Sequence, residues 1–496
     1  MTVNRAVTIQ LTRNALNGLQ FLKPEEIDRI HVGALALLEK VGLKVELKEA
    51  VDLLHGNGAK VEKGDGFFKV KLPPSLVEDC IAQTPKELTY YGRNKENDLI
   101  YPTNNTAFAA FGQCVNVLDL VTGEARPSTK ADIEISARIQ DALSNLKTVA
   151  RTMAPGDKPP NTQAIHCIDA IVRNTGKHIS GGASDRRTLR MIIQMLEVAA
   201  GSAEAFKSRP FYSPSFCPTS PLTLGKSCCE VAIDAAAYGL NMVVMIMPLA
   251  GGTGPATIAG TVTLGIAEQL SGLVLTQLTR KASPITLGSA TTIMDLKSGI
   301  SAMGAPESGM INACLAQMAQ FYQLPCRVAC GVSDACMLDA QIGYEFSLNA
   351  FMAAMAGATI IFGGGALESG LTHSPAKLLM DHESMCHIHQ ILNGVSVDNE
   401  DLALEVTSEI GPGNSFLMHR HTFDRMKSQS RSVVFNRQPR ESWMMQKSSN
   451  SVSVSATEQA LGIIENHTPP ALPDGADQVL TEMINTFEAQ LVSTNG

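Results

Sequence analysis

The stretch LPCRVACGVSDACMLDAQIGYE, residues 324–345, joins a short apolar run to a polar loop and then to a segment with helical spacing. The apolar run ends at Gly331, and this order predicts a buried strand, a loop and the start of a helix. In α/β folds, working groups most often lie where a parallel strand ends and its helix begins. The loop that carries Ser333, Asp334 and Met337 is therefore the first candidate for a functional site.

The same pattern repeats along the chain, because apolar strand candidates alternate with helix-length segments from Thr106 onward. No GxGxxG motif follows an early strand, so an open doubly wound sheet fits less well than a closed barrel. The sequence thus predicts an α/β fold, a (β/α)8 TIM barrel. Its eight strands are predicted at residues 106–112, 148–154, 178–182, 211–217, 242–248, 285–290, 326–331 and 359–363. Its helices are predicted to begin near Lys130, Thr162, Asp185, Leu224, Thr257, Pro306, Asp339 and Ala376.

Three regions follow from this pattern. Residues 1–105 are predicted to form a mixed N-terminal cap or oligomerisation segment, residues 106–395 the TIM barrel, and residues 396–496 a C-terminal helical extension packed on the barrel. In the extension, the Ser-rich stretch 448–455 is a candidate mobile link. The cap is predicted to hold helices from Pro24, Lys48 and Pro74 and a hairpin over 88–101. The buried face of its first helix is predicted to comprise Ile30, Val32, Ala34, Leu37 and Leu38.

Bulk composition excludes several classes of protein. The net charge of -8 gives no electrostatic reason to expect binding to nucleic acid or to acidic membranes. Eleven cysteines without paired CxxC spacing indicate reduced thiols rather than a disulfide framework. Residues 1–10 lack the basic and apolar regions of a secretory signal, so a cytoplasmic location is the expectation.

One apolar stretch raises the alternative of a membrane span, because residues 235–267 carry no formally charged side chain. The stretch is interrupted by MPLAGGTGP at residues 247–255, which would break a spanning helix in its middle. A buried strand, a glycine loop and a buried helix account for the same residues, so no membrane is predicted.

Candidate functional groups are selected by their place at the carboxyl ends of the predicted strands. A phosphate cradle at Gly251, Gly252 and Gly254 is one possibility, but the loop lacks the Lys-Ser/Thr of a P-loop. A tight turn, or close approach of a large flat ligand, is the favoured interpretation of these glycines. The other selected residues are Gln113, Arg151, Met153, Gly181, Ser213, Thr219, Ser289, Thr291, Ser333, Asp334, Met337, Glu368 and His373.

Two further groups of residues have an ordinary and a functional interpretation. His382, Cys386 and His389 are spaced on one side of a helix, but they match no zinc pattern, so a structural role is favoured and no metal is predicted. Five aromatic residues occupy strand positions that would face the barrel mouth. Core packing is their default role, and a cage for a quaternary ammonium group is the alternative. They are Phe108, Phe111, Tyr212, Phe216 and Phe362.

Several longer segments resemble the trimethylamine:corrinoid methyltransferase superfamily, and the similarity extends over nearly the whole chain. The resemblance implies a TIM barrel whose open mouth receives the corrinoid of a separate small protein, and transfer of a methyl group from an amine to cobalt. The segments are GGASD at 181–185, MPLAGGTGPATIAG at 247–260, GAPE at 304–307, SD at 333–334, DAQIGYE at 339–345 and FLMHRHT at 416–422.

Trimethylamine enzymes of that family carry pyrrolysine in the loop after strand seven, where this chain has Met337. The chain therefore resembles the non-pyrrolysine members, which are similar to methyltransferases for glycine betaine and other quaternary amines. The substitution has a chemical rationale. A neutral tertiary amine is a poor methyl donor, whereas a quaternary ammonium leaves as a neutral amine, so methyl transfer needs chiefly positioning and exclusion of water.

Under this methyltransferase hypothesis, the positions of the candidate residues at the strand ends indicate their roles. Asp334, Met337 and His373 are the expected catalytic residues, and His373 or Arg151 is expected to meet a substrate carboxylate. Gly181, Gly251, Gly252 and Gly254 are expected near the corrinoid. The expected substrate-binding residues are Phe108, Phe111, Arg151, Tyr212, Ser333, Phe362, Glu368 and His373.

The cofactor is expected to come from a partner, because the chain lacks the Asp-x-His-x-x-Gly motif with which corrinoid carriers supply an axial histidine. The nearest match, Asp28-Arg-Ile-His31, has the wrong spacing. A corrinoid-binding protein, a small quaternary amine and a second copy of the chain in a homo-oligomer are thus the expected partners. The alternatives are the same chemistry on proline betaine, carnitine or γ-butyrobetaine, and a non-catalytic betaine-binding protein.

Overall fold

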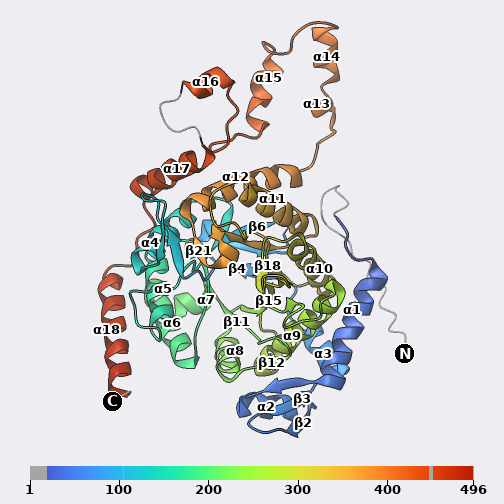
Figure 1. Ribbon diagram of the computed structural model, residues 1–496, viewed down its shortest axis with the longest axis vertical. Helices are drawn as coiled ribbons and strands as arrows, with labels where there is room; N and C mark the ends of the chain where they lie inside the picture. Colours follow the sequence, from blue (N-terminus) through green and yellow to red (C-terminus); the bar gives the residue numbers. More distant parts are fainter. Residues whose placement is uncertain (1–18, 104, 446–450, 495–496) are drawn as a thin grey trace.

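Eight parallel strands form a closed barrel at the centre of the computed structural model, which describes residues 19–103, 105–445 and 451–494 (Figure 1). The strands follow one another around the barrel in chain order, and the last pairs with the first. The predicted (β/α)8 TIM barrel and its eight predicted strands are confirmed, with ends that shift by a few residues. The strands are β6 (Ala107–Ala110), β9 (Leu146–Ala150), β10 (His178–Gly182), β11 (Tyr212–Phe216), β13 (Met242–Ile246), β15 (Ile285–Ser289), β18 (Cys326–Ala329) and β19 (Ile360–Gly364).

Eight helices surround the barrel, and each begins within two residues of its predicted start. Side chains that precede several of them accept hydrogen bonds from the first turn, as Asp185 does from Thr188 N–H at 2.7 Å. The short helix α7 (Ala203–Ser208) is an addition that the sequence pattern did not predict. The eight are α4 (Lys130–Ala142), α5 (Gln163–Val172), α6 (Arg186–Ala199), α8 (Lys226–Tyr238), α9 (Ile258–Thr279), α10 (Pro306–Tyr322), α11 (Ala340–Met355) and α12 (Pro375–Leu392).

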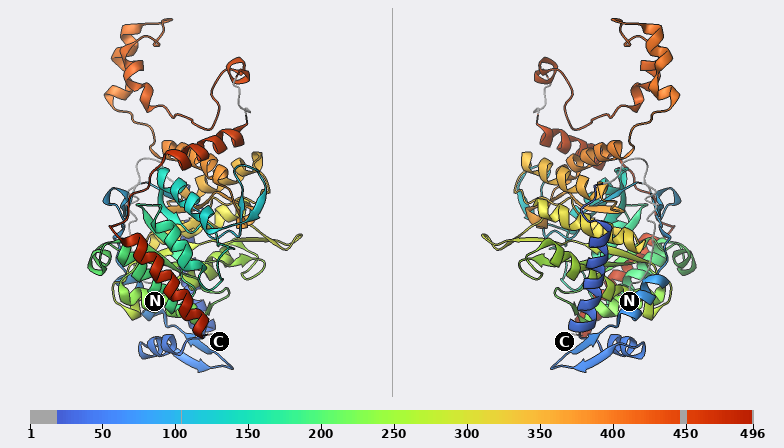
Figure 2. Two further views of the ribbon diagram at one scale, coloured as in Figure 1. Left: turned by 90° about the vertical axis from the view of Figure 1, so that its left-hand side faces the viewer. Right: turned by 90° about the vertical axis from the view of Figure 1, so that its right-hand side faces the viewer.

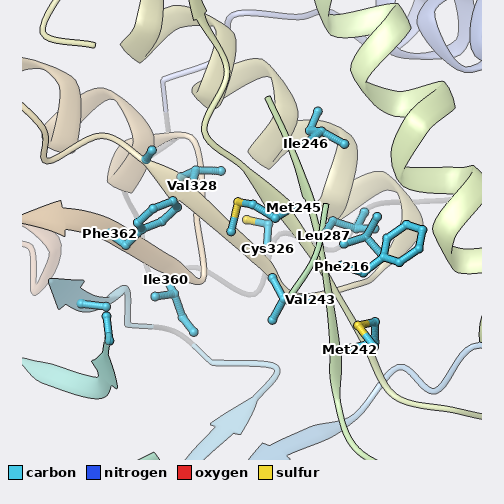
Figure 3. Packing of buried hydrophobic residues seen from close by; sticks show 14 of the residues in the cluster. Phe216, Met242, Val243, Met245, Ile246, Leu287, Cys326, Val328, Ile360 and Phe362 are labelled. Carbon is cyan, nitrogen blue, oxygen red and sulfur yellow. The ribbon is translucent and has the colours of Figure 1, made fainter. Parts of the chain in front are cut away.

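The core has two layers, because successive strand residues point to opposite faces. On the inner face, a Cβ added to Gly288 of β15 would lie 2.9 Å from both Met245 and Val243 of β13. On the outer face, a Cβ on Gly272 of α9 would lie 2.7 Å from Val244 and 2.8 Å from Phe216. Figure 3 shows Phe216, Val243 and Met245 among the packed side chains of the barrel.

Helix α9 is apolar on all sides because it is covered on all sides. It packs on β13 and β15 of the barrel, and it also contacts α1 (Pro24–Ala36), α2 (Lys48–Gly56) and α3 (Pro74–Gln83) of the N-terminal segment. Among the described residues it is the one helix long and apolar enough to cross a membrane, and 78% of its most apolar window is buried. Its composition is therefore that of a core helix between two protein layers.

The N-terminal segment also contains a small sheet that the sequence pattern did not predict. Strands β1 (Leu43–Val45), β2 (Lys60–Lys63) and β3 (Phe68–Lys71) join β12 (Thr223–Leu224), which comes from the barrel region. The predicted helices are confirmed, and a π-helical turn extends α1 as far as Val41. Val32 was wrongly assigned to the buried face, since 63% of its surface is exposed.

The predicted hairpin is confirmed as β4 (Leu88–Tyr90) and β5 (Leu99–Tyr101), and it closes the amino end of the barrel. The Tyr90 hydroxyl lies 2.6 Å from Thr286 Oγ1. His178 of β10 bonds Tyr91 O at 2.9 Å and Ser213 Oγ at 2.8 Å. Buried polar groups fill this end, whereas exposed residues such as Gln113, Thr219 and Met337 follow the carboxyl ends of the strands. The carboxyl end is therefore the open one, and Ser213 lies far from it.

The C-terminal region divides into parts that pack on the barrel and a part that does not. Helix α17 (Val452–Asn466) contacts α12 and α4, and α18 (Ala476–Thr494) contacts α5 and α6. The segments that carry α13 (Asn399–Leu402), α14 (Leu404–Ile410), α15 (Arg420–Arg425) and α16 (Arg440–Met444) project away from the body (Figures 1 and 2). Between α15 and α16 the chain returns to α12, where Val433 N–H donates to the carboxylate of Glu383 and Val434 is buried. The division into three domains stays a prediction.

Two predictions concern residues outside the described part of the chain. The absence of a signal peptide rests on residues 1–10, which are not described. The mobile link predicted over 448–455 falls partly outside as well, and Ser451 caps α17, so residues 452–455 are helical.

Candidate active site

Two small sheets form a rim around the open end of the barrel. One contains β14 (Leu249–Ala250), β16 (Thr292–Asp295) and β17 (Ile300–Ala302). Its β16–β17 hairpin projects from the body in the side views (Figure 2). The other contains β20 (Ala366–Leu367), β21 (Thr372–His373), β7 (Asn116–Leu118) and β8 (Ala125–Pro127).

The residues selected at strand ends differ in their access to this open end. Gln113 and Thr219 are exposed, whereas Met153, Ser289 and Thr291 are fully buried. Exposure therefore excludes the end of β15 and keeps the selected positions after β6, β9, β11, β13, β18 and β19 and Gly181 at the end of β10.

The loop after β18 is held by two carboxylates. Asp334 accepts hydrogen bonds from Met303 N–H at 2.9 Å, Gly304 N–H at 3.0 Å and the Ser369 hydroxyl at 2.5 Å. Glu345 of α11 accepts bonds from the Ser333 hydroxyl at 2.5 Å and from Asp334 N–H at 2.9 Å. Burial raises the pKa of the Asp334 carboxyl. The structure thus gives Ser333 and Asp334 internal partners, so both organise the loop.

The loop after β19 is joined to this one and holds an uncommon backbone conformation. Glu368 and Ser369 both have positive φ, 52° and 54°, which non-glycine residues rarely adopt. Glu368 N–H donates to Ala335 O and Ser369 N–H donates to Ser333 O, each at 3.0 Å. Because such a conformation persists only where neighbours impose it, the two loops form one unit at the mouth. Met337 lies on this unit and is 62% exposed to solvent.

Asp334→Asn is expected to loosen the connection between these loops. One oxygen of Asp334 would become an amide that faces a backbone N–H, and losing a hydrogen bond to a charged group costs about 1.5–3 kcal/mol. Hydrogen exchange measured by mass spectrometry should show the Met303 and Gly304 amides exchanging about tenfold faster or more. Ser369→Ala, which leaves both amide bonds in place, is the control. Unchanged exchange at both amides in Asp334→Asn would contradict this role.

Two of the predicted aromatic residues meet at the mouth. The rings of Phe111 and Phe362 are stacked, with centroids 6.1 Å apart and an interplanar angle of 11°. Phe111 is half-buried, and Phe362 is 4% exposed. The other face of this pair is occupied, because the Arg327 guanidinium lies 4.9 Å from the centroid of Phe362.

Three of the predicted aromatic residues do not face the mouth. The Phe108 ring lies 5.2 Å from His389 of α12, on the outer face of the barrel. Tyr212 is fully buried, and its hydroxyl donates to Gly181 O at 2.8 Å. Phe216 faces α9. The assignments of Phe108 and Tyr212 to substrate binding are therefore wrong, because their positions on the strands point them outward.

His373 was also misassigned. It is fully buried, with Nε2 3.0 Å from Ser136 Oγ of α4. Burial, together with the nearby charge of Lys377, lowers its pKa to about 3, so the ring is neutral. A neutral, enclosed histidine cannot offer a cation to a substrate carboxylate. Glu368, the residue expected beside it, is half-buried and accepts a bond from the Thr372 hydroxyl at 2.9 Å.

Arg151 is placed as predicted, at the end of β9 and half-buried. Its guanidinium donates to Gln113 Oε1 and, at 3.4 Å, to Gly182 O. Gly181 is half-buried beside it. Among the described residues no carboxylate pairs with Arg151, so it remains a candidate for an anionic group at the mouth.

The glycine loop is a closed turn. Gly251 N–H donates to Gly254 O, and the N–H groups of Gly252 and Gly254 both donate to Leu249 O. Gly251 has φ +87°, and a Cβ on Gly252 would lie 2.6 Å from Met294. Since its backbone donors are used internally, the loop is not a phosphate cradle, and the turn interpretation holds.

Of the three residues considered as metal ligands, His389 and Cys386 have partners within the protein, whereas His382 Nε2 is buried without a hydrogen-bond partner among the described residues. His389 bonds Asn145 Oδ1 at 3.1 Å and Thr106 O at 2.6 Å, and Cys386 accepts a bond from Asn145. His31 likewise bonds Tyr322 and Glu78. In the described part of the chain no group of three His, Cys, Asp or Glu side chains is arranged to hold a metal ion.

One residue of the barrel interior escaped selection. Arg327 extends from β18 across the barrel to Ser180 on β10, to which it donates a hydrogen bond. It lies within residues 324–345, but inside a predicted buried strand, whereas functional groups were expected in loops and at strand ends. A single arginine in an otherwise apolar predicted strand was the available signal.

Comparison with known proteins shows which family the chain matches. The chain matches the family model described as trimethylamine methyltransferase (MTTB) over residues 2–491. It is 37% identical over 474 residues to the trimethylamine methyltransferase MttB of Desulfitobacterium hafniense (strain DSM 10664 / DCB-2), covering 95% of this chain and 94% of that relative. It is 27% identical over 466 residues to the glycine betaine methyltransferase of Desulfitobacterium hafniense (strain Y51), covering 93% of this chain and 96% of that relative. The solved monomethylamine methyltransferase of Methanosarcina barkeri aligns over 90% of this chain and 94% of its own, with a TM-score of 0.49 and 12% identity.

Proposed function

Because the chain belongs to the trimethylamine methyltransferase (MTTB) family, we propose that it transfers a methyl group from a quaternary amine to the corrinoid of a partner protein. Glycine betaine is the proposed substrate, in keeping with the relative named as a glycine betaine methyltransferase. Proline betaine, carnitine and γ-butyrobetaine carry the same trimethyl- or dimethylammonium and carboxylate groups, and they are the alternatives.

Met337 is the observation that carries the choice of a quaternary amine. It is an ordinary thioether side chain, 62% exposed, on the loop after β18 at the open end. A thioether is not an electrophile that activates a neutral amine. A quaternary ammonium needs no such activation, because its leaving group is already a neutral amine. An ordinary residue in this loop therefore favours a substrate that arrives as a cation.

The partner is proposed to bind over the rim of the open end. Met247, Leu296 and Ile300 of the rim are 51%, 74% and 60% exposed, and the exposed turn at Gly251 brings backbone without a side chain to the surface beside them. A flat macrocycle and its carrier can approach such an edge closely. When bound, the corrinoid cobalt supplies the nucleophile that accepts the methyl group.

The residues of this chain are proposed to position the substrate and exclude water from it. The tied loops that carry Asp334, Glu368 and Ser369 give the mouth a fixed shape. Phe111, which is half-buried and stacked on Phe362, offers its accessible aromatic surface to the ammonium group. Fixed geometry of this kind is the main contribution that a direct methyl transfer requires.

The eleven free cysteines accord with a reducing compartment, and the enzyme is proposed to be cytoplasmic.

One assay tests this function. The purified chain is mixed with reduced cobalamin and, in separate reactions, glycine betaine, proline betaine, carnitine or trimethylamine, and the visible spectrum is followed for methylated corrinoid. We expect methylation with at least one quaternary amine and none with trimethylamine. Without the enzyme or without the corrinoid, no methyl transfer is expected.

Trimethylamine belongs in the assay because the relative at 37% identity is named as a trimethylamine methyltransferase. Methylation from trimethylamine alone would overturn the quaternary-amine proposal. If no substrate reacts but calorimetry shows that glycine betaine binds, the chain is a betaine-binding protein instead.

A further inference from the structure

Three cations are buried among the described residues: Lys177, Arg327 and Lys377, with 4%, 6% and 0% of their surface exposed. Lys177 donates to the carbonyls of Gln140 and Leu143 at 2.7 and 2.8 Å, at the end of α4. Lys377 lies 2.7 Å from the carboxylate of Asp381. Both therefore have acceptors that offset the cost of burying a charge.

Arg327 has no comparable partner. The strand order puts β18 and β10 on opposite sides of the eight-stranded barrel, so its bond to Ser180 means that the side chain crosses the interior. Its Nε is buried without a hydrogen-bond partner, and within the described residues no carboxylate lies within ion-pair distance. A single hydrogen bond to a serine hydroxyl offsets little of the free-energy cost of burying a guanidinium charge.

The charge of Arg327 is nevertheless present at neutral pH. Burial lowers its pKa to about 10, and this value is still well above 7. The guanidinium lies under the ring of Phe362, which stacks in turn on Phe111 toward the open end. The barrel thus holds an unpaired cation directly beneath the aromatic pair at its mouth.

We propose that Arg327 binds the carboxylate of the substrate and so selects quaternary amines that carry a carboxylate over those that do not. This inference rests on the proposed function and narrows it to betaines. A planar guanidinium can bind a carboxylate through two parallel hydrogen bonds, which would satisfy the free donors of Arg327. With the carboxylate held there, the methylated end of a small betaine lies on the side of Phe111 and Phe362.

Binding measurements test this assignment without the corrinoid. Calorimetry with glycine betaine is compared for wild type, Arg327→Met and Arg327→Lys. Removing one partner of a buried, hydrogen-bonded charge pair is expected to weaken binding about 100-fold in Arg327→Met, and Arg327→Lys should recover part of it. Binding of a carboxylate-free amine, tetramethylammonium, measured in the same way, should not weaken in Arg327→Met. Arg151→Gln tests the other arginine at the mouth.

A second measurement separates a binding role from a structural one. If Arg327 were needed to hold the barrel together, Arg327→Met would lower the melting temperature. If it is an unpaired charge kept for a ligand, the ligand-free variant should melt at the same temperature as wild type or higher. Addition of glycine betaine should raise the melting temperature of wild type and not of Arg327→Met.

The failures of the two proposals are distinguishable. Arg327 is excluded as the carboxylate site if Arg327→Met binds glycine betaine as wild type does, or if Arg151→Gln alone loses binding. The assignment is also wrong if Arg327→Met melts at a lower temperature than wild type and keeps the same affinity for glycine betaine relative to tetramethylammonium. Betaine binding that depends on Arg327, without methyl transfer to cobalamin, would leave this inference standing and remove the proposed function. A wild-type chain that binds no carboxylated quaternary amine removes both.

Discussion

Lys377→Met is expected to lower the free energy of unfolding by about 3–5 kcal/mol, because it leaves the buried carboxylate of Asp381 without its counter-ion. Lys377 Nζ also donates to Gly331 O at 3.1 Å, and it lies 5.4 Å from the centroid of Phe346. The substitution therefore removes a link between the end of β18 and α12. Urea denaturation of both proteins measures the change.

The double variant Lys377→Met/Asp381→Asn is the matched control. Asparagine keeps an oxygen that can accept the bond from Gly365 N–H, which is 2.7 Å from Asp381 in the native protein. It carries no charge, so most of the lost stability should return. If the double variant is as unstable as the single one, the cost comes from lost packing rather than from the unpaired charge.

Glu268→Gln is expected to stabilise the protein at pH 8 by about 3 kcal/mol and to have little effect at pH 4. Glu268 of α9 is fully buried, and it accepts bonds from the Ser220 hydroxyl at 2.8 Å and Leu222 N–H at 2.9 Å. Burial raises its pKa from 4.5 to about 7, against the opposing effect of these two bonds. Above pH 7 the folded protein therefore holds a buried charge that glutamine would not carry.

The sign of this effect follows from proton binding. Below pH 4.5 the carboxyl is protonated in both states and contributes nothing. Between pH 4.5 and about 7 the folded state keeps a proton that the unfolded state has released, so stability falls as pH rises. The difference in unfolding free energy between variant and wild type, measured from pH 4 to pH 8, should rise across this window. Glu465→Gln, at an exposed position of α17, should give a flat difference. A flat difference for Glu268→Gln would mean that its charge is not buried.

The barrel was predictable because its signals are local. An apolar run of four to seven residues followed by a helix-length segment occurs eight times, and a capping residue, where one is present as at Asp185, fixes a helix start to within a residue or two. The sheet of β1, β2, β3 and β12 had no such signal. Lys60–Lys63 is a polar strand, and β12 pairs with β1 from a position far along the chain.

The direction of a side chain from a buried strand was not predictable, because both faces of a barrel strand are apolar. Phe108 and Phe111 are three positions apart, so they point to opposite faces, and only the register of β6 against β19 decides which one is inside. The same ambiguity led to the wrong assignment of Tyr212, whose neighbour Ser213 faces inward instead.

The sequence predicted where the candidate site lies better than it predicted which residues form it. The loop after β18 does lie at the open end, and Ser333, Asp334 and Met337 are on it. His373 was chosen for its place in a loop, and nothing in LTHSP indicates that the ring is enclosed against α4. Arg327 was not predicted, because functional groups were expected in the loops at strand ends; a charged residue within a buried strand is itself uncommon and indicates a specific role.

The cover over α9 has a consequence for how the chain is made. Its outer layer, α1 to α3, comes from residues 24–83, which leave the ribosome long before α9 does. The 22-residue apolar helix therefore emerges when its covering surface has already been synthesised. Reversing that order, for example in a circular permutant that places this layer last, would expose α9 during synthesis and favour aggregation.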